Sequence, residues 1–304
     1  MGAGLMEGET VESDVVRQQS FEVEGAVEID IALLAGRVRV HLVDEPGVHV
    51  EVRHEASAGE AWTAGLNSLL SWVNDQFGAG RGQPTGPAEA VRDARVELTG
   101  QRLSVQSSKS LPLRAVALGV TVRAPIGSSV IAKSGAADVT VTGAAARLEI
   151  RTGTGDVTAD RADASSQVNS GSGKVRLGPM LGGLRAKTGS GDIEVSSVGG
   201  NTILYTGTGD VWLGAVQNDV QVRTGSGDVT VADAASGRIQ MGTGSGDVRV
   251  GIRPGVAAQI DLVSSSGTAR SELDVSNTPP EGEARLFVTG RTGSGDALVT
   301  ASTS

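Results

Sequence analysis

One short motif returns along this chain at a nearly constant interval. The strings TGTGDV, TGSGDI and TGSGDV, with the variants SGAADV and NSGSGKV, follow one another at steps of 18 residues and once of 19. The fifth position of the motif, here called the acid column, holds Asp138, Asp156, Lys174, Asp192, Asp210, Asp228, Asp247 and, in a last copy, Asp296. A unit of this length cannot bury its own hydrophobic side chains, so the copies must pack against one another.

Hydrophobic residues alternate on both sides of each motif. Ile193 and Val195 follow one acid at every second position, and Val220 and Val222 precede a later acid in the same way. A period of two is typical of β-strands with one buried face. Each coil is therefore predicted to have two strands. A small or aliphatic residue six positions after the acid, such as Val216, is expected to fill a third, short side.

The order of these hydrophobic columns predicts how the units pack. Antiparallel hairpins would need a mirrored order in alternate units, and the sequence shows none. Left-handed solenoids repeat their apolar positions about every six residues, which these columns do not do. The predicted fold class is therefore all-β: a single-chain parallel β-solenoid, or right-handed β-helix, with about 18 residues per coil and one inserted amphipathic helix.

Residues 18–301 are predicted to form one solenoid domain, most regular over 133–251. Stretches upstream of 133 alternate with irregular spacing, and we expect them to be earlier coils. The inserted helix is predicted at 57–78, where Ser57 and Glu60 form a capping box before apolar residues at helical spacing. The other predicted segments are a flexible acidic N-terminus at 1–17, a flexible loop at 79–94 and a tail at 302–304.

Composition argues against several function classes. The chain has no cysteine and three histidines, and it shows no Ser-His-Asp arrangement, nucleotide loop or metal-ligand spacing. We therefore expect no enzymatic activity, no cofactor and no metal. The whole net charge of -9 arises in the N-terminal fifth. Because no basic stripe emerges and only seven residues are aromatic (Trp 3, Tyr 1, Phe 3), we also expect no nucleic-acid partner.

The chain contains no apolar run near the roughly 20 residues of a membrane span, and its N-terminus lacks the features of a signal peptide. We accordingly expect no membrane span and a cytoplasmic location.

The run APIGSSV at 124–130, followed by S-G-x-x-D-V-x-V and the TGSGDV copies, resembles the bacterial putative-adhesin domain of unknown function. Members of that family are β-strand-repeat proteins. The resemblance covers roughly residues 20–300 and implies a solenoid fold. It supplies no catalytic residues, and it makes the helix at 57–78 an insertion.

Two interpretations of the acid column are open. In the first, the column forms turns: glycines one and three positions before the acid adopt left-handed backbone angles, and the carboxylate accepts backbone N–H groups. In the second, the stacked acids bind a row of cations. Because Lys174 interrupts the row, the turn interpretation is favoured. The threonines of the motif share parity with the inward positions and are expected to be buried.

Tyr205 and Trp212 are the candidate contacts for a ligand or partner. They flank one corner of a single coil, and both are expected to point outward. Exposed rings in so aromatic-poor a chain indicate a carbohydrate or protein contact. The alternative, which the sequence favours, is that the rings pack under arginine stems of adjacent coils.

The last coil, 285–301, has only three residues after it, so its strand edge is expected to be bare. This favours end-to-end self-association. The function expected from the sequence is a non-enzymatic scaffold or interaction module that binds a protein partner or itself. The alternative is a carbohydrate-binding or polysaccharide-processing β-helix that uses Tyr205 and Trp212.

Overall fold

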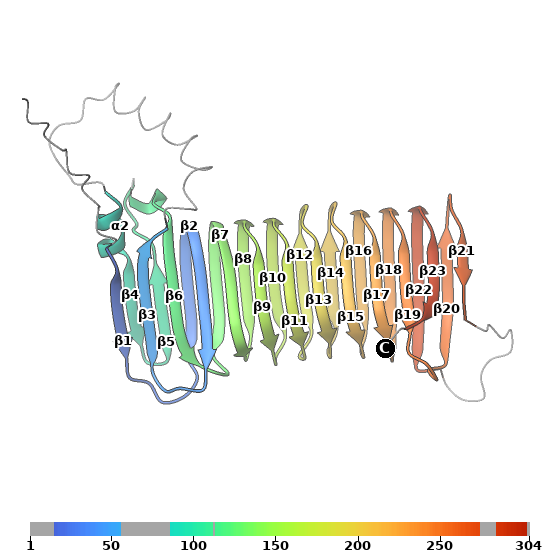
Figure 1. Ribbon diagram of the computed structural model, residues 1–304, viewed down its shortest axis with the longest axis horizontal. Coiled ribbons are helices and arrows are strands. Elements are labelled where there is room, and N and C mark those ends of the chain that lie inside the picture. Colours follow the sequence, from blue (N-terminus) through green and yellow to red (C-terminus); the bar gives the residue numbers. More distant parts are fainter. Residues whose placement is uncertain (1–14, 56–85, 112, 274–283, 303–304) are drawn as a thin grey trace, which may run out of the picture.

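The computed structural model describes residues 15–55, 86–111, 113–273 and 284–302. Its strands are stacked in one long row, with the N-terminal elements at one end and the C-terminal elements at the other (Figure 1). The predicted helix at 57–78 lies outside the described residues, as do 1–14 of the predicted N-terminus.

The regular coils have two strands each, except that the single long strand β7 pairs with both strands of the next coil, and each strand pairs in parallel with its counterparts in the neighbouring coils of the stack. Ile193 is the register partner of Val211, and Val195 that of Leu213, as the repeat of 18 residues predicts. The parallel β-solenoid is thereby confirmed. The coils are β7 (Ser129–Ala145), β8 and β9 (Leu148–Thr154, Val157–Ala162), β10 and β11 (Ser166–Ser172, Val175–Met180), β12 and β13 (Leu184–Thr188, Ile193–Val198), β14 and β15 (Thr202–Thr206, Val211–Val216), β16 and β17 (Val220–Ser226, Val229–Ala234), and β18 and β19 (Gly237–Ser245, Val248–Ile252).

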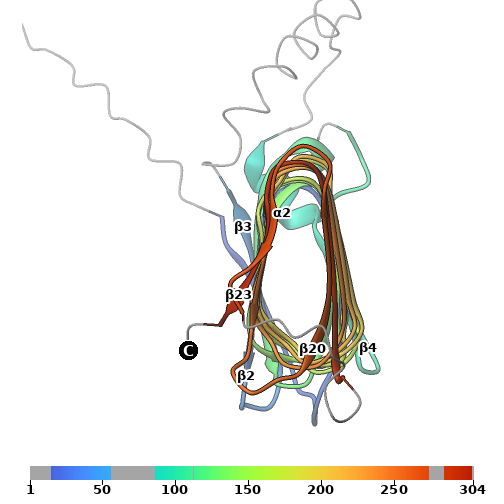
Figure 2. The ribbon, with the colours of Figure 1, turned by 90° about the vertical axis from the view of Figure 1, so that its right-hand side faces the viewer.

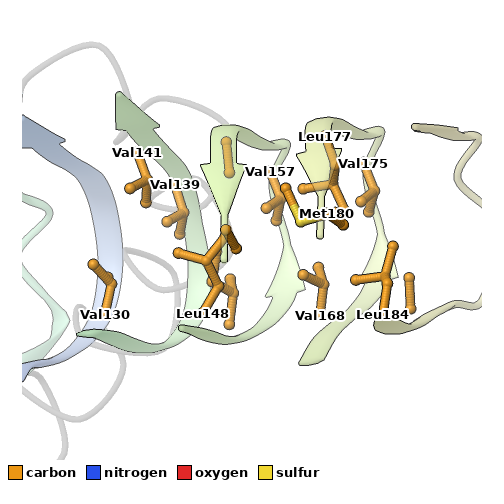
Figure 3. Packing of buried hydrophobic residues seen from close by; sticks show 14 of the residues in the cluster. Val130, Val139, Val141, Leu148, Val157, Val168, Val175, Leu177, Met180 and Leu184 are labelled. Atoms are coloured by element: carbon orange, nitrogen blue, oxygen red, sulfur yellow. The ribbon is translucent and has the colours of Figure 1, made fainter. Parts of the chain in front are cut away.

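Viewed along the row, the coil is a flattened ring with two long sides (Figure 2). The expected third side is absent from the regular coils: the residue six positions after the acid, such as Met180, ends the second strand and is fully buried. Val157, Val175 and Leu184 point into the space between the two sides (Figure 3), where all three are at most 2% exposed. The core is therefore an aliphatic layer that runs the length of the row.

The N-terminal end departs from the parallel pattern. β2 (Glu28–Val43) runs along both long sides and pairs in parallel with β7, β5 (Arg102–Gln106) and β6 (Leu118–Pro125). Beyond these strands the pairing is antiparallel: β3 (Val48–His54) on β6, β1 (Arg17–Phe21) on β3, and β4 (Arg95–Thr99) on β5. The expectation of earlier coils holds for β2, β5 and β6 but is wrong for β1, β3 and β4.

The segment 87–93, predicted to belong to a flexible loop, forms the short helix α2 (Pro87–Asp93). Pro87 occupies the start of the helix, where its missing N–H leaves no hydrogen bond unmade. Ala90 and Val91 are fully buried against β3 and the 3-10 helix η2 (Leu113–Ala115). The burial of these two side chains stabilises a helix in a stretch that its Gly and Pro residues had indicated to be loop.

The C-terminal coils are not stacked in the order of the sequence. β22 (Leu286–Ser294) lies between β18 and β20 (Ala258–Ser264), and β23 (Ala297–Ala301) lies between β19 and β21 (Ala269–Ser271). The last coil of the sequence is therefore the second from the end of the row (Figure 1). The prediction that 285–301 presents a bare edge is wrong, because β20 and β21 cover it.

The acid column explains this order. Oδ1 of Asp296 accepts the backbone N–H of Thr268, at 2.8 Å. Thr268 occupies the corresponding position of the coil 258–271 but has no carboxylate to offer to a further coil. The coil with the complete motif is therefore inside the stack, and the coil with the incomplete motif ends it.

Candidate functional site

The acid column is a ladder of hydrogen bonds between coils. Oδ1 of Asp192 accepts the backbone N–H of Asp210 at 3.1 Å, and Oδ1 of Asp210 accepts that of Asp228 at 2.8 Å. The same contact joins Asp138 to Asp156, Asp156 to Lys174, Asp228 to Asp247 and Asp247 to Asp296. Lys174 carries no acceptor, and its Nζ instead lies 2.5 Å from Oε1 of Glu194. These contacts give the column a structural role.

The two glycines of the motif are needed for different structural reasons. A Cβ on Gly225 would lie 2.6 Å from the carbonyl oxygen of Gly207, to which the N–H of Gly225 donates at 3.0 Å. The glycine three positions before the acid is thus required by the close approach of two coils, and the expected left-handed angle is absent there. The glycine directly before the acid does adopt such an angle in several coils, as at Gly227 with φ 139°.

The threonine of the motif connects neighbouring turns. Thr206 is buried, its Oγ1 donates to the carbonyl oxygen of Gly191 at 3.0 Å, and it accepts the N–H of Gly209 at 3.1 Å. Its burial confirms the expected inward orientation. The recurrent Asp and Thr side chains of the motif therefore have a role in stacking.

The described residues contain no group of three or more His, Asp or Glu side chains that could hold a metal ion. Within the described residues, each carboxyl group whose pKa departs from its ordinary value has a lowered pKa. The N–H of Thr268 lowers the pKa of Asp296, and the guanidinium of Arg253 lowers the pKa of Asp233. A general acid needs the opposite shift at neutral pH, so these carboxylates are suited to structure rather than to proton transfer.

Trp212 lies beside a shallow groove on one long side of the solenoid. Its side chain is 43% exposed, and the indole lies over Gly214, whose missing Cβ leaves room for it. The groove, of about 450 Å³, is called here the Trp212 groove. It is lined by Thr158, Asp160, Arg176, Gly178, Glu194, Ser196 and Trp212, among others.

Charged groups beside the indole are fixed by mutual contacts. Glu194, the register partner of Trp212, accepts a hydrogen bond from Nε of Arg176 at 3.2 Å. It also forms an ion pair with Lys174. An exposed ring next to oriented polar groups offers an apolar surface together with hydrogen-bonding partners. The Trp212 groove can therefore bind an uncharged or mixed ligand such as a sugar or a peptide side chain.

Tyr205 does not share this groove. It lies on β14, whereas Trp212 lies on β15, and the two strands belong to the opposite long sides of the ring (Figure 2). Outward side chains of opposite sides point away from each other. Both rings project outward on either side of the turn that joins β14 to β15, as expected, but they face in different directions and only Trp212 lines the groove.

Tyr205 belongs instead to a row of cations. The sheet register aligns the outward side chains at this position over eight coils, and the set is called here the cation row. It consists of Lys133, Arg151, Asn169, Lys187, Tyr205, Arg223, Gly242 and Arg291. Five members are basic and none is acidic. The sequence-based statement that no basic stripe emerges is thus corrected by the register.

No helix in the described part of the chain is long and apolar enough to cross a membrane.

The C-terminal third of the chain matches a known family. Residues 200–304 match the family model described as Toastrack DUF4097. The resemblance to a β-strand-repeat family that the motifs indicate is confirmed over this segment. A comparison with curated proteins found no match.

Solved structures of low sequence identity are similar over most of their length. A putative adhesin from Bacteroides fragilis is 12% identical, with a TM-score of 0.42, over 94% of this chain and 97% of that chain. A putative adhesin from Parabacteroides distasonis is 10% identical, with a TM-score of 0.30, over 94% and 98%. A putative lipid binding protein from the same organism is 8% identical, with a TM-score of 0.33, over 92% and 96%.

Proposed function

We propose that this protein is a non-enzymatic interaction module that binds a partner in the Trp212 groove. The observation that carries the proposal is the exposed indole of Trp212 beside the fixed carboxylate of Glu194. Aromatic side chains in such positions supply a large share of binding free energy at interfaces.

The scaffold suits such a role because it is rigid where the groove lies. Trp212, Glu194 and Arg176 project from three adjacent strands in unbroken parallel register, with buried aliphatic residues behind them. A site on a regular sheet loses little conformational entropy when it binds. The partner class that fits the groove is a carbohydrate or a protein surface with exposed polar groups.

The test is binding of a panel of soluble neutral and acidic polysaccharides to the wild type and to Trp212→Ala. The matched control is Thr230→Ala, because Thr230 is the next side chain along the same outward row. We expect Trp212→Ala to weaken binding about tenfold or more and the control to have little effect. Equal binding by the two variants would contradict the proposal. Release of reducing ends from any polysaccharide in the panel would instead indicate a polysaccharide-processing enzyme.

A second candidate function, end-to-end self-association, is favoured by β20. Ile260 and Leu262 pack on the core but are only partly buried, and within the described residues no strand pairs with the outer edge of β20. A second copy that paired there would bury them. Light scattering at rising protein concentration tests this: we expect oligomers that Ile260→Lys abolishes, and a monomer at every concentration would exclude it.

A further inference from the structure

A notch interrupts the cation row near its C-terminal end. Arg223, Gly242 and Arg291 are successive register partners on β16, β18 and β22. Because Gly242 has no side chain, the two arginines flank an open space of about 380 Å³, which Val263 and Ser265 help to line. This space is called here the arginine notch. It lies on the long side opposite the Trp212 groove.

Both arginines are available to a ligand. Arg223 is exposed and makes no ion pair with any residue of the described ranges. Arg291 is 69% exposed, and its nearest carboxylate, on Asp261, is 3.9 Å away and itself 60% exposed. An ion pair of this length between exposed side chains contributes little and is screened by salt. The two guanidinium groups can therefore turn toward an anion in the notch.

The charges of the row have a regular spacing. From Arg151 onward, cations occupy every second coil, at Arg151, Lys187, Arg223 and Arg291, separated by Asn169, Tyr205 and Gly242. Lys133 lies on the coil directly before Arg151, which itself pairs with Glu149 at 3.1 Å. Two strand spacings correspond to about 10 Å. The row is thus a straight, rigid line of positive charges at about this interval.

We propose that the arginine notch binds a carboxylate-bearing sugar of a linear acidic polysaccharide, and that the rest of this chain lies along the cation row. Guanidinium groups bind carboxylates in a bidentate manner. The outward row next to the cations contains three amides, which can donate to and accept from sugar hydroxyls. This row runs Glu149, Gln167, Arg185, Ile203, Gln221, Gln240 and Thr289. This ligand class matches a straight row in which charged and neutral polar side chains alternate.

Other polyanions fit the row less well. An acidic peptide in extended form binds through an unpaired strand edge, but the cation row lies on the face of a sheet whose strands are paired on both sides. Single-stranded nucleic acid is bound by successive aromatic side chains on which its bases stack. Tyr205 is the one aromatic member of the row.

The decisive variant is Gly242→Glu. A Cβ at Gly242 has no atom within 4 Å, so the larger side chain does not disturb the packing. Its carboxylate would occupy the notch and pair with Arg223 and Arg291. The control is Gln259→Glu, which adds the same charge at an exposed position of β20, on the same long side but outside the cation row and the row beside it. Circular dichroism melting curves establish that both variants fold.

Binding is measured by calorimetry with an oligogalacturonate at low ionic strength. We expect Gly242→Glu to weaken binding about tenfold or more, Gly242→Gln to weaken it by occupying the notch without charge, and Gln259→Glu to weaken it less than about threefold. Binding by the wild type should also fall as salt is added. The fully methyl-esterified oligomer, which lacks the charges, should not bind.

Three outcomes would overturn the proposal. The first is the absence of oligogalacturonate binding to the wild type. The second is an equal effect of Gly242→Glu and Gln259→Glu, which would show that net charge rather than the notch determines affinity. The third is that a single-stranded DNA oligomer of the same charge, or vesicles rich in anionic lipid, bind more tightly than the oligogalacturonate and are equally sensitive to Gly242→Glu.

Discussion

Oδ1 of Asp247 accepts the backbone N–H of Asp296, 49 residues further along the chain, at 2.9 Å. The acids before it make the same contact with a residue 18 or 19 positions away. Between Asp247 and Asp296 the chain therefore passes over one coil position, forms the terminal coil 258–271, and returns to fill the gap. The terminal coil thereby covers the last complete copy of the motif.

Engineered disulfides test this order directly, because the natural chain has no cysteine. Arg249 and Leu298 are register partners on adjacent strands, whereas Arg249 and Arg270 are two strands apart. A disulfide needs Cα atoms within about 7 Å, and two strand spacings are about 10 Å. We expect the pair Arg249→Cys and Leu298→Cys to cross-link under mild oxidation. Preferential cross-linking of Arg249→Cys with Arg270→Cys would show that the coils follow sequence order.

Removing one carboxylate from the acid column should loosen one contact between coils. Asp210→Ala leaves the N–H of Asp228 without its acceptor, and we expect a loss of about 1 kcal/mol in the free energy of unfolding, measured in urea. Asp210→Asn keeps an acceptor oxygen and should lose less. If the two variants are equally stable, the hydrogen bond is not what the column contributes.

Two glycines that both lie on outward positions of the same long side should differ sharply. Gly225→Ala brings a Cβ within 2.6 Å of a backbone oxygen, which forces two coils apart, and we expect it to cost about 3 kcal/mol or more. Gly242→Ala meets no atom within 4 Å and should change stability by less than about 1 kcal/mol, in the stabilising direction. Melting temperatures of the two variants give the comparison. Similar values would refute the close-approach explanation.

Thr206→Val should destabilise the protein although it keeps the shape of the side chain. It leaves a buried N–H on Gly209 and a carbonyl oxygen on Gly191 without the partner that now joins two coils. The expected cost is about 1–3 kcal/mol by chemical denaturation. Thr206→Ser keeps the hydroxyl and should lose much less stability. If Thr206→Val is as stable as the wild type, the hydrogen bonds of Thr206 do not contribute to stability.

Acid should loosen the terminal coil. The N–H of Thr268 lowers the pKa of Asp296 below the ordinary value for Asp, 3.8. Because the folded pKa is the lower one, the unfolded state binds the extra proton. The contribution of this contact is therefore fully present above the ordinary pKa of Asp and is lost as pH falls through the lower pKa of the folded state. Protection of the Thr268 N–H from hydrogen exchange, taken relative to the intrinsic exchange rate at each pH, should fall in that range in the wild type, and Asp296→Asn should remove this pH dependence.

The stacking of the regular coils could be predicted from the sequence because it depends on spacing alone. A constant step of 18 residues places Ile193 beside Val211 whatever the rest of the chain does. The order of the last coils could not be predicted in this way. It depends on which coil can offer a carboxylate to the next, and Thr268 takes the place of the acid in a segment whose spacing no longer matches the motif.

The two candidate surfaces show a similar division. The outward direction of Trp212 and Tyr205 follows from parity along each strand, but their separation depends on the chain reversing direction between β14 and β15. The arginine notch depends on three residues, Arg223, Gly242 and Arg291, that become neighbours only through a register that skips a coil. A glycine at an outward strand position outside the motif was the signal in the sequence that could have indicated it.

Thr268 ends the ladder of carboxylates, and it lies in the coil 258–271, which is the outermost coil of the stack. The length of the molecule is consequently independent of how it terminates. Duplication of one whole 18-residue unit within 133–251 would extend both faces by a single step and leave the closing segment unchanged. Repeated duplication of this kind would lengthen the protein in steps of one coil and leave the residues at both ends unchanged.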